Sequence, residues 1–278
     1  LLLCRLWQQQ EGVHLDGVLQ CGDLGFFPDP DRLDRATKKF AKRDPEELGY
    51  WRYFAKPAPQ ESDARTELIL GGDPDDLGTV RCPIVFCHGN HEDFELLADI
   101  VQDDELRAVD HFERLQYLRS GSVMDVGGIR VAAIGGAPED PGDNKAARLG
   151  PRVSATAVQG LKKQAFDVLL THGGPRGIGG ETDQWGSALL RKLIETTQPA
   201  FQFFAHHGQP IPIARIGQTT CVWHSDTSFE RTPSGDPTGC VHPGAMSLLR
   251  WNNRSDATIS TISEPWFRNV TGVSWQYY

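Results

Sequence analysis

The chain alternates between short apolar runs and longer segments with apolar residues on one side only. Residues 84–87 are all apolar, which is the length of a buried strand, and the run is followed by Gly89. Residues 93–101 then have the apolar spacing of a helix. Similar apolar runs occur at three other places: residues 16–21, 166–171 and 201–205. Strands that lead directly into polar loops are typical of an α/β protein.

The remaining pattern predicts further elements around these four strands. Helices are expected at 1–10, 154–164 and 185–196, and strands at 115–118, 122–126 and 129–134, with a hairpin turn at Gly127-Gly128. Antiparallel strands that close a second sheet are expected at 211–216, 219–223, 246–251 and 257–262. Residues 28–76 are charged and mostly helical in spacing, and are interpreted as an insertion beside the loop that follows residues 16–21.

Composition narrows the classes of protein to consider. The 278 residues, 39% of them hydrophobic, are expected to form a single domain with a substantial core. A net charge of −9 (28 basic minus 37 acidic residues) disfavours non-specific binding to nucleic acid or an anionic membrane. The six cysteines form no C-x-x-C pair, which favours reduced thiols and a cytoplasmic protein. No apolar run approaches the roughly 18 residues that span a bilayer.

Polar side chains follow each of the four strands that lead into loops. Asp23 follows the first strand, Asn90 and His91 the second, His172 the third and His206 the fourth. If these strand ends share one edge, a carboxylate, an amide and two imidazoles surround one point. That set suits Mn, Fe, Zn or Co better than Mg or Ca, which prefer oxygen ligands. A carboxylate can also bridge two ions for displacement at phosphorus, and His91 could then protonate the departing oxygen.

The motifs at these positions resemble those of the calcineurin-like metallophosphoesterases. The matching segments are Gly22-Asp23, Gly89-Asn90-His91-Glu92, Thr171-His172-Gly173-Gly174 and Ala205-His206-His207-Gly208. The family order is D-x-H, G-D, G-N-H-[D/E], H and G-H-x-H. The resemblance implies a four-layer α/β/β/α sandwich of two mixed sheets, formed by one domain over residues 1–278 with the helical insertion at about 28–76.

The resemblance also implies a reaction and a role for each residue. It implies a phosphoesterase that hydrolyses a phosphomonoester or phosphodiester by attack of a metal-bound hydroxide, with two divalent metal ions, manganese among the candidates. Asp23 would bridge the ions, and Asn90, His172 and His206 would complete the ligands of one of them. His91 would be the acid beside the leaving group. The expected substrate is a phosphorylated small molecule or a nucleotide.

Two departures from the family pattern affect the second ion. No D-x-H precedes Asp23, and the chain has no initial methionine, so we expect the sequence to begin after the family's first strand. The second histidine of G-H-x-H corresponds to Gly208, while His207 occupies the variable position. Either His207 serves as a substitute ligand or the second ion has fewer protein ligands. We therefore expect one ion to be bound more tightly than the other.

Two alternative functions are also compatible with the sequence. The missing ligands motivate a non-catalytic or weakly active module that binds a phosphorylated partner. Gly-Asn-His-Glu followed by His-Gly-Gly is also similar to the serine/threonine protein phosphatases. In those enzymes an Asp-Arg-Gly follows Gly-Asp, and the segment from Gly22 to Phe27 has no such arginine, which counts against that class.

Several other residues are given structural interpretations. His88 lies near the expected site in sequence, but strand alternation directs its side chain elsewhere. Arg176 is expected on a solvated turn, and the aromatic residues at 50–54 are expected to pack. Gly72-Asp73 is interpreted as a turn, because Pro74 follows and no long strand precedes it.

Overall fold

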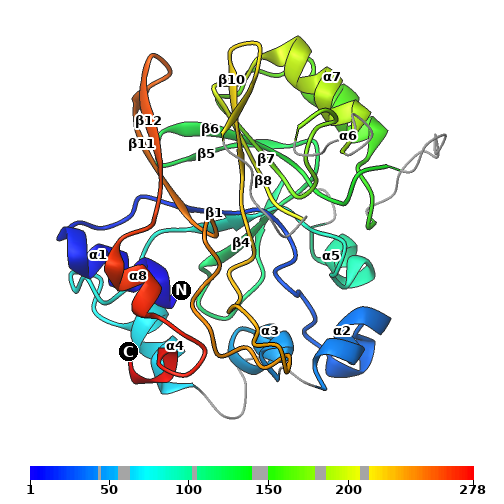
Figure 1. The fold of residues 1–278 in the computed structure, drawn as a ribbon. Coiled ribbons are helices and arrows are strands. Elements are labelled where there is room, and N and C mark those ends of the chain that lie inside the picture. Colours follow the sequence, from blue (N-terminus) through cyan, green and yellow to red (C-terminus); the bar gives the residue numbers. More distant parts are fainter. Residues whose placement is uncertain (43–44, 56–62, 102–104, 140–149, 179–185, 207–212) are drawn as a thin grey trace.

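The structure, a computed structural model, describes residues 1–42, 45–55, 63–101, 105–139, 150–178, 186–206 and 213–278. These residues form two large mixed sheets with helices around them (Figure 1). Within the described part of the chain, no helix is both long enough and apolar enough to cross a bilayer.

The smaller sheet contains the strands that lead to Asp23 and Asn90. Its order is β1 (Val18–Gln20), β2 (Ile84–Phe86), β4 (Leu115–Leu118) and β3 (Leu106–Ala108). β1, β2 and β4 are parallel, and β3 runs antiparallel to β4. All three residues of β2 are buried, which explains its continuous apolar sequence. β3 was not predicted, because three residues of mixed polarity show no recognisable alternation.

The larger sheet contains the strands that lead to His172 and His206. Its order is β5 (Val123–Val126), β6 (Ile129–Ile134), β7 (Val168–Thr171), β8 (Phe201–Phe204), β10 (Thr219–Trp223) and β9 (Ala214–Ile216). The four central strands are parallel, and β5 and β9 are antiparallel strands at the edges. The predicted β5–β6 hairpin is confirmed, with positive φ angles of 58° and 83° at Gly127 and Gly128.

The prediction of four antiparallel strands closing a second sheet is partly wrong. β9 and β10 pair antiparallel with each other, but β10 is parallel to β8 and continues the larger sheet. β11 (Ser247–Asn253) and β12 (Asp256–Thr261) form a separate two-stranded ladder. Apolar alternation identifies strands but does not show whether neighbouring strands are parallel or antiparallel. The turns and connections between the strands determine that direction. Residues 211–212 lie outside the described part of the chain.

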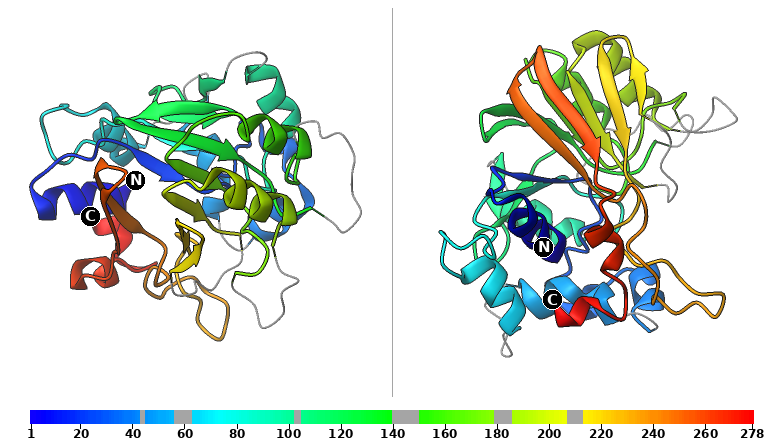
Figure 2. Two further views of the ribbon diagram at one scale, coloured as in Figure 1. Left: turned by 90° about the horizontal axis from the view of Figure 1, so that it is seen from above. Right: turned by 60° about the vertical axis from the view of Figure 1, so that its left-hand side comes forward.

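Three hydrophobic clusters define the layers. One lies between the sheets, where Val85 and Leu118 of the smaller sheet belong to the same cluster as Val131 and Leu170 of the larger one. A second cluster packs α6 (Ala155–Leu161) and α7 (Ala188–Thr197) on the outer face of the larger sheet. The third packs α1 (Leu2–Glu11), α3 (Gly49–Tyr53), α4 (Ala64–Gly71) and α5 (Phe94–Val101) on the smaller sheet. Figures 1 and 2 show these helices on the outside of the two sheets.

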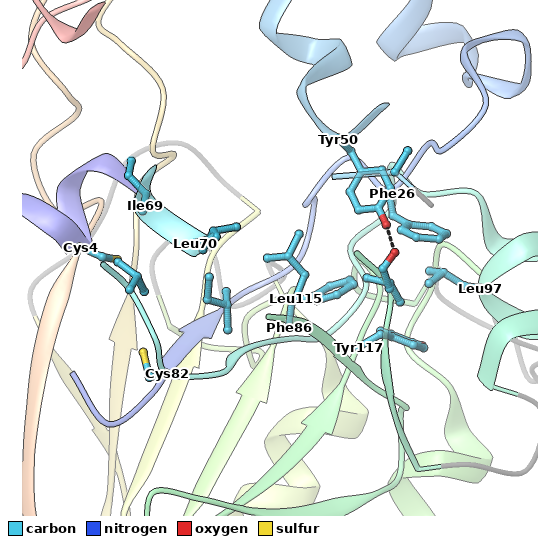
Figure 3. Packing of buried hydrophobic residues seen from close by; sticks show 14 of the residues in the cluster. Cys4, Phe26, Tyr50, Ile69, Leu70, Cys82, Phe86, Leu97, Leu115 and Tyr117 are labelled. Atoms are coloured by element: carbon cyan, nitrogen blue, oxygen red, sulfur yellow. Dashed lines mark hydrogen bonds between the residues drawn. The ribbon is translucent and has the colours of Figure 1, made fainter. Parts of the chain in front are cut away.

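The described part of the segment predicted as a helical insertion is mostly helical. It contains η1 (Pro30–Arg32), α2 (Arg35–Phe40), η2 (Pro45–Leu48), α3 and α4. Tyr50 of α3 is buried, packs edge-on against Phe26, and donates its hydroxyl hydrogen to the carbonyl oxygen of Val109 (Figure 3). These contacts connect the insertion to the loop that carries Asp23. The predicted turn at Gly72-Asp73 is confirmed, since the N–H of Asp76 donates to the carbonyl of Asp73.

The C-terminal segment returns to the N-terminal helix. α8 (Pro265–Asn269) and η3 (Trp275–Tyr277) follow β12, and Phe267 and Val270 share a buried cluster with Leu3 and Trp7 of α1. Figure 1 shows α8 beside α1.

Candidate metal centre

Four strand ends, two from each sheet, meet at one place. Asp23 follows β1 and Asn90 follows β2, while His172 follows β7 and His206 follows β8. Ligand atoms of Asp23, His172 and His206 all lie within 4.8 Å of one another. The amide oxygen Oδ1 of Asn90 lies 3.0 Å from Nε2 of His172. The structure thus brings together four of the five residues predicted as metal ligands. The fifth, His207, lies outside the described residues.

Two of these residues have an unusual backbone conformation. Asp23 and His206 have φ angles of 54° and 73°. These values lie in the left-handed region, which residues other than glycine rarely adopt. Such a conformation costs about 1–3 kcal/mol per residue and is found mainly at functional sites. The surrounding fold therefore holds both side chains in place at a cost to stability.

Gly22 and Gly89 allow the two loops of the smaller sheet to touch. Gly22 has a φ angle of 90°, and a Cβ atom there would lie 2.7 Å from Nδ1 of His172. A Cβ atom on Gly89 would lie 1.9 Å from Oδ1 of Asp23 and 2.3 Å from its backbone nitrogen. Neither position can hold a side chain unless Asp23 or His172 moves.

Gly89→Ala is accordingly expected to displace Asp23 and destabilise the protein. The overlap involves backbone, which cannot rotate away, so we expect a loss of about 1–3 kcal/mol in the free energy of unfolding and weaker metal binding. Gly160→Ala is the matched control, because a Cβ atom there meets nothing within 4 Å and the residue lies in α6. That variant should be about 0.5–1 kcal/mol more stable than the parent. Denaturant unfolding of both variants measures the difference, and equal stabilities would contradict the close approach.

The Asp23 carboxylate is held by the backbone of the neighbouring loop. Its Oδ1 accepts hydrogen bonds from the N–H groups of Asn90 at 2.7 Å and His91 at 3.0 Å. Burial alone would raise the pKa of Asp23, but without a metal ion the hydrogen bond and charge of protonated His172, together with the N–H of His91, hold this pKa well below its usual range. Asp23 is therefore ionised and fixed in orientation, as a metal ligand must be.

His172 presents one defined nitrogen to the cluster. The side chain is buried, and its Nδ1 lies 2.8 Å from the carbonyl oxygen of Cys21, which can only accept, so Nδ1 carries the hydrogen. In neutral His172, Nε2 then directs a lone pair at Asn90 Oδ1, 3.0 Å away, and at Asp23 Oδ2, 3.4 Å away. Three atoms that offer electron pairs repel one another unless a cation or a proton lies among them. One carboxylate, one amide oxygen and imidazole nitrogen fit a divalent transition ion.

Glu92 fixes the loop around Asp23, a role that the sequence motif did not reveal. Its buried carboxylate accepts N–H bonds from Leu24 at 3.0 Å, Phe26 at 2.5 Å and Gly89 at 3.3 Å. Burial and the nearby charge of Asp23 raise the pKa of Glu92 to about 8, although these three N–H groups favour its charged form. Glu92 therefore ties the loop after β1 to the loop after β2.

His91 is held by a carboxylate from the helical segment. Its Nδ1 lies 2.7 Å from Oδ2 of Asp34, which is also the N-cap of α2 and accepts from the N–H of Thr37. With the Nδ1 hydrogen donated to Asp34, Nε2 is the nitrogen that can exchange a proton with a bound molecule. About 38% of the His91 side chain is exposed, so it is accessible from solvent. The spacing of Asp34 and Thr37 predicts a helix cap, but nothing in the sequence connects it to His91.

The residues with structural interpretations do not belong to the group formed by Asp23, His172 and His206. His88 is buried and its Nδ1 lies 2.8 Å from the hydroxyl of Tyr117. Burial lowers the pKa of His88 to about 3, so it stays neutral in the core. Arg176 is exposed on the loop after β7. Trp51 is 41% exposed on α3, beside the buried Tyr50.

Comparison with known proteins found similarity among solved structures. No family model matches it, and a search of curated proteins found no match. Among solved structures, the protein TT1561 of Thermus thermophilus shares 16% identity over 88% of this chain and 97% of its own, with a TM-score of 0.42. A second solved structure shares 14% identity over 81% of this chain and 85% of its own, with a TM-score of 0.46. At this level of similarity neither structure bears on the function of this chain.

Proposed function

We propose that this chain is a metal-dependent phosphoesterase of the calcineurin-like class, which hydrolyses a phosphomonoester or phosphodiester. The observation that carries the proposal is the convergence of Asp23, Asn90 and His172, where Nε2 of His172 lies 3.0 Å from Asn90 Oδ1 and 3.4 Å from Asp23 Oδ2. The order of the motifs along the chain and the packing of two mixed sheets between helices support the same class.

The four convergent side chains are the proposed ligands of the more tightly bound ion. Asp23, Asn90, His172 and His206 supply two oxygens and two imidazole rings. A divalent ion bound there would neutralise phosphoryl oxygens and activate water for in-line displacement. Two ions are proposed, with His207 the remaining candidate ligand for the second, more weakly bound one.

The remaining chemistry falls to groups that do not bind metal. His91 is the proposed acid, and its Nε2 would give a proton to the departing oxygen while Nδ1 stays bonded to Asp34. Glu92 does not touch the reacting atoms, and it keeps the loops of Asp23 and Gly89 together. The backbone N–H groups of Asn90 and His91 fix Asp23 in the orientation that an ion requires.

Hydrolysis of mono- and bis-nitrophenyl phosphate with increasing Mn²⁺ tests the proposal. The expected result is saturable turnover that disappears when the metal is chelated and returns when it is restored. Metal binding without turnover of either ester would contradict the proposed enzyme and favour a module that binds a phosphorylated partner. Failure to bind any of Mn, Fe, Zn or Co would contradict both.

Asp34→Asn is expected to lower turnover without affecting metal binding. Asparagine fits the same space and can still cap α2, but it no longer offers a charged acceptor to His91 Nδ1. We expect kcat to fall about tenfold or more, since general acid catalysis contributes roughly 10²–10⁴-fold. Asp31→Asn is the matched control, because Asp31 is exposed three residues earlier in the chain. Steady-state kinetics and Mn²⁺ titration of both variants give the comparison, and equal kcat values would argue against a role for Asp34.

A further inference from the structure

The second helix of the chain carries an open surface cleft that is bordered by four basic residues and one leucine. The cleft has a volume of about 490 Å³ and is lined by Leu33, Arg35, Lys38, Lys39 and Lys42. We call these five residues the basic cleft. Nothing in the proposed metal centre uses them.

Among the described residues, no carboxylate forms an ion pair with the basic cleft. Arg35, Lys38, Lys39 and Lys42 are all exposed, and none forms an ion pair with any carboxylate of the described residues. Lys38 Nζ donates to the carbonyl oxygen of Asp31 at 3.3 Å, and Lys39 Nζ lies 5.8 Å from the centre of the Phe40 ring. Four cations within eight residues stand out in a chain with a net charge of −9. A cleft lined by one sign of charge concentrates ions of the opposite sign.

The basic cleft is attached directly to the metal centre. Asp34, which lies between the lining residues Leu33 and Arg35, holds His91 at 2.7 Å. Just before it, Arg32 Nη2 donates to Asp93 Oδ1 at 2.8 Å and to Glu95 Oε2 at 2.9 Å. With a rise of about 1.5 Å per residue, Lys38 and Lys39 lie only ~6–8 Å along α2 from Asp34. The cations therefore lie on the same helix as the residue that holds the proposed acid.

We propose that the basic cleft binds a second anionic group of the substrate, so that the preferred substrate is a small phosphate ester with at least one further phosphate. This inference rests on the proposed function. Lysine and arginine side chains are the usual partners of phosphate oxygens. The small volume and the acidic remainder of the chain favour a multiply phosphorylated small molecule over a nucleic acid.

The first experiment measures anion binding without any catalytic step. Inorganic pyrophosphate is titrated into the metal-free protein by calorimetry, and Lys38→Gln/Lys39→Gln is compared with the parent. Lys162→Gln/Lys163→Gln removes the same charge from the end of α6 and serves as the control. We expect the α2 variant to bind pyrophosphate at least about tenfold more weakly than the parent, which is a large effect for two exposed charges. The control should bind pyrophosphate with the affinity of the parent. Equal binding by all three proteins would overturn the proposal.

The second experiment links the basic cleft to turnover. For a sugar bisphosphate, kcat/KM of the α2 variant should fall about tenfold through KM, while nitrophenyl phosphate should be hydrolysed at the parental rate. Equal losses on both substrates, or none on the bisphosphate, would overturn the role in substrate binding. A parent protein that binds pyrophosphate through Lys38 and Lys39 but hydrolyses no phosphate ester would overturn the proposed function and support the basic cleft as an anion site.

Discussion

Replacing Asp23 with asparagine is expected to abolish metal binding and turnover together. Asn Oδ1 can still accept the N–H groups of Asn90 and His91, so the loops should keep their positions. What disappears is the only carboxylate among the four convergent side chains. A metal ion contributes several kcal/mol to transition-state stabilisation, and each 1.36 kcal/mol is tenfold in rate, so we expect a fall of at least about 10³-fold in kcat/KM.

Asp226→Asn is the matched control for this loss. Asp226 is exposed and belongs to none of the four strand ends, so this variant should keep both Mn²⁺ affinity and activity. Calorimetric titration of Mn²⁺ and hydrolysis of nitrophenyl phosphate are measured on the same preparations, with circular dichroism to establish folding. Parental activity in a folded Asp23→Asn variant would contradict the assignment of Asp23 as a metal ligand.

Replacing His91 with alanine is expected to abolish turnover while leaving metal binding intact. The N–H group of residue 91 that bonds Asp23 belongs to the backbone and remains in the variant. The lost imidazole is the proposed proton donor, and general acids contribute roughly 10²–10⁴-fold to rate. The loss should be largest for an alkyl phosphate, whose departing alkoxide needs a proton more than nitrophenolate does.

The comparison of leaving groups separates proton donation from a structural role. His242→Ala serves as the control, because His242 is a half-buried histidine outside the four strand ends. A structural defect in His91→Ala would reduce turnover of alkyl and nitrophenyl phosphates equally. Loss of Mn²⁺ affinity in His91→Ala would instead place the imidazole among the ligands, against the proposed role.

The convergence of the four side chains was predictable because it depends on strand ends. Asp23, Asn90, His172 and His206 each follow an apolar run that becomes a strand directed toward the same edge. Such runs are visible in the sequence because buried parallel strands need apolar residues on both faces. The glycine turn after β2 was also predictable from the sequence. Its physical cause is that a Cβ atom at Gly89 would overlap Asp23.

The contacts that depend on packing between distant segments were not predictable. Asp34 lies 57 residues from His91 in sequence, and its distance of 2.7 Å to that ring follows from how the helical segment packs against the loop after β2. The sequence identifies Glu92 only as part of a motif. Its three hydrogen bonds from backbone N–H groups depend on how the two loops pack together. The parallel pairing of β10 with β8 was missed because strand direction is set by turns, not by apolar pattern.

Diffraction from a crystal grown with Mn²⁺, recorded at a wavelength where manganese scatters anomalously, tests the central claim most directly. We predict a manganese peak about 2.0–2.2 Å from Asp23 Oδ2, Asn90 Oδ1 and His172 Nε2, with His206 as a further ligand. A map with no peak among these atoms at saturating Mn²⁺, or with manganese bound only elsewhere on the chain, would contradict the account.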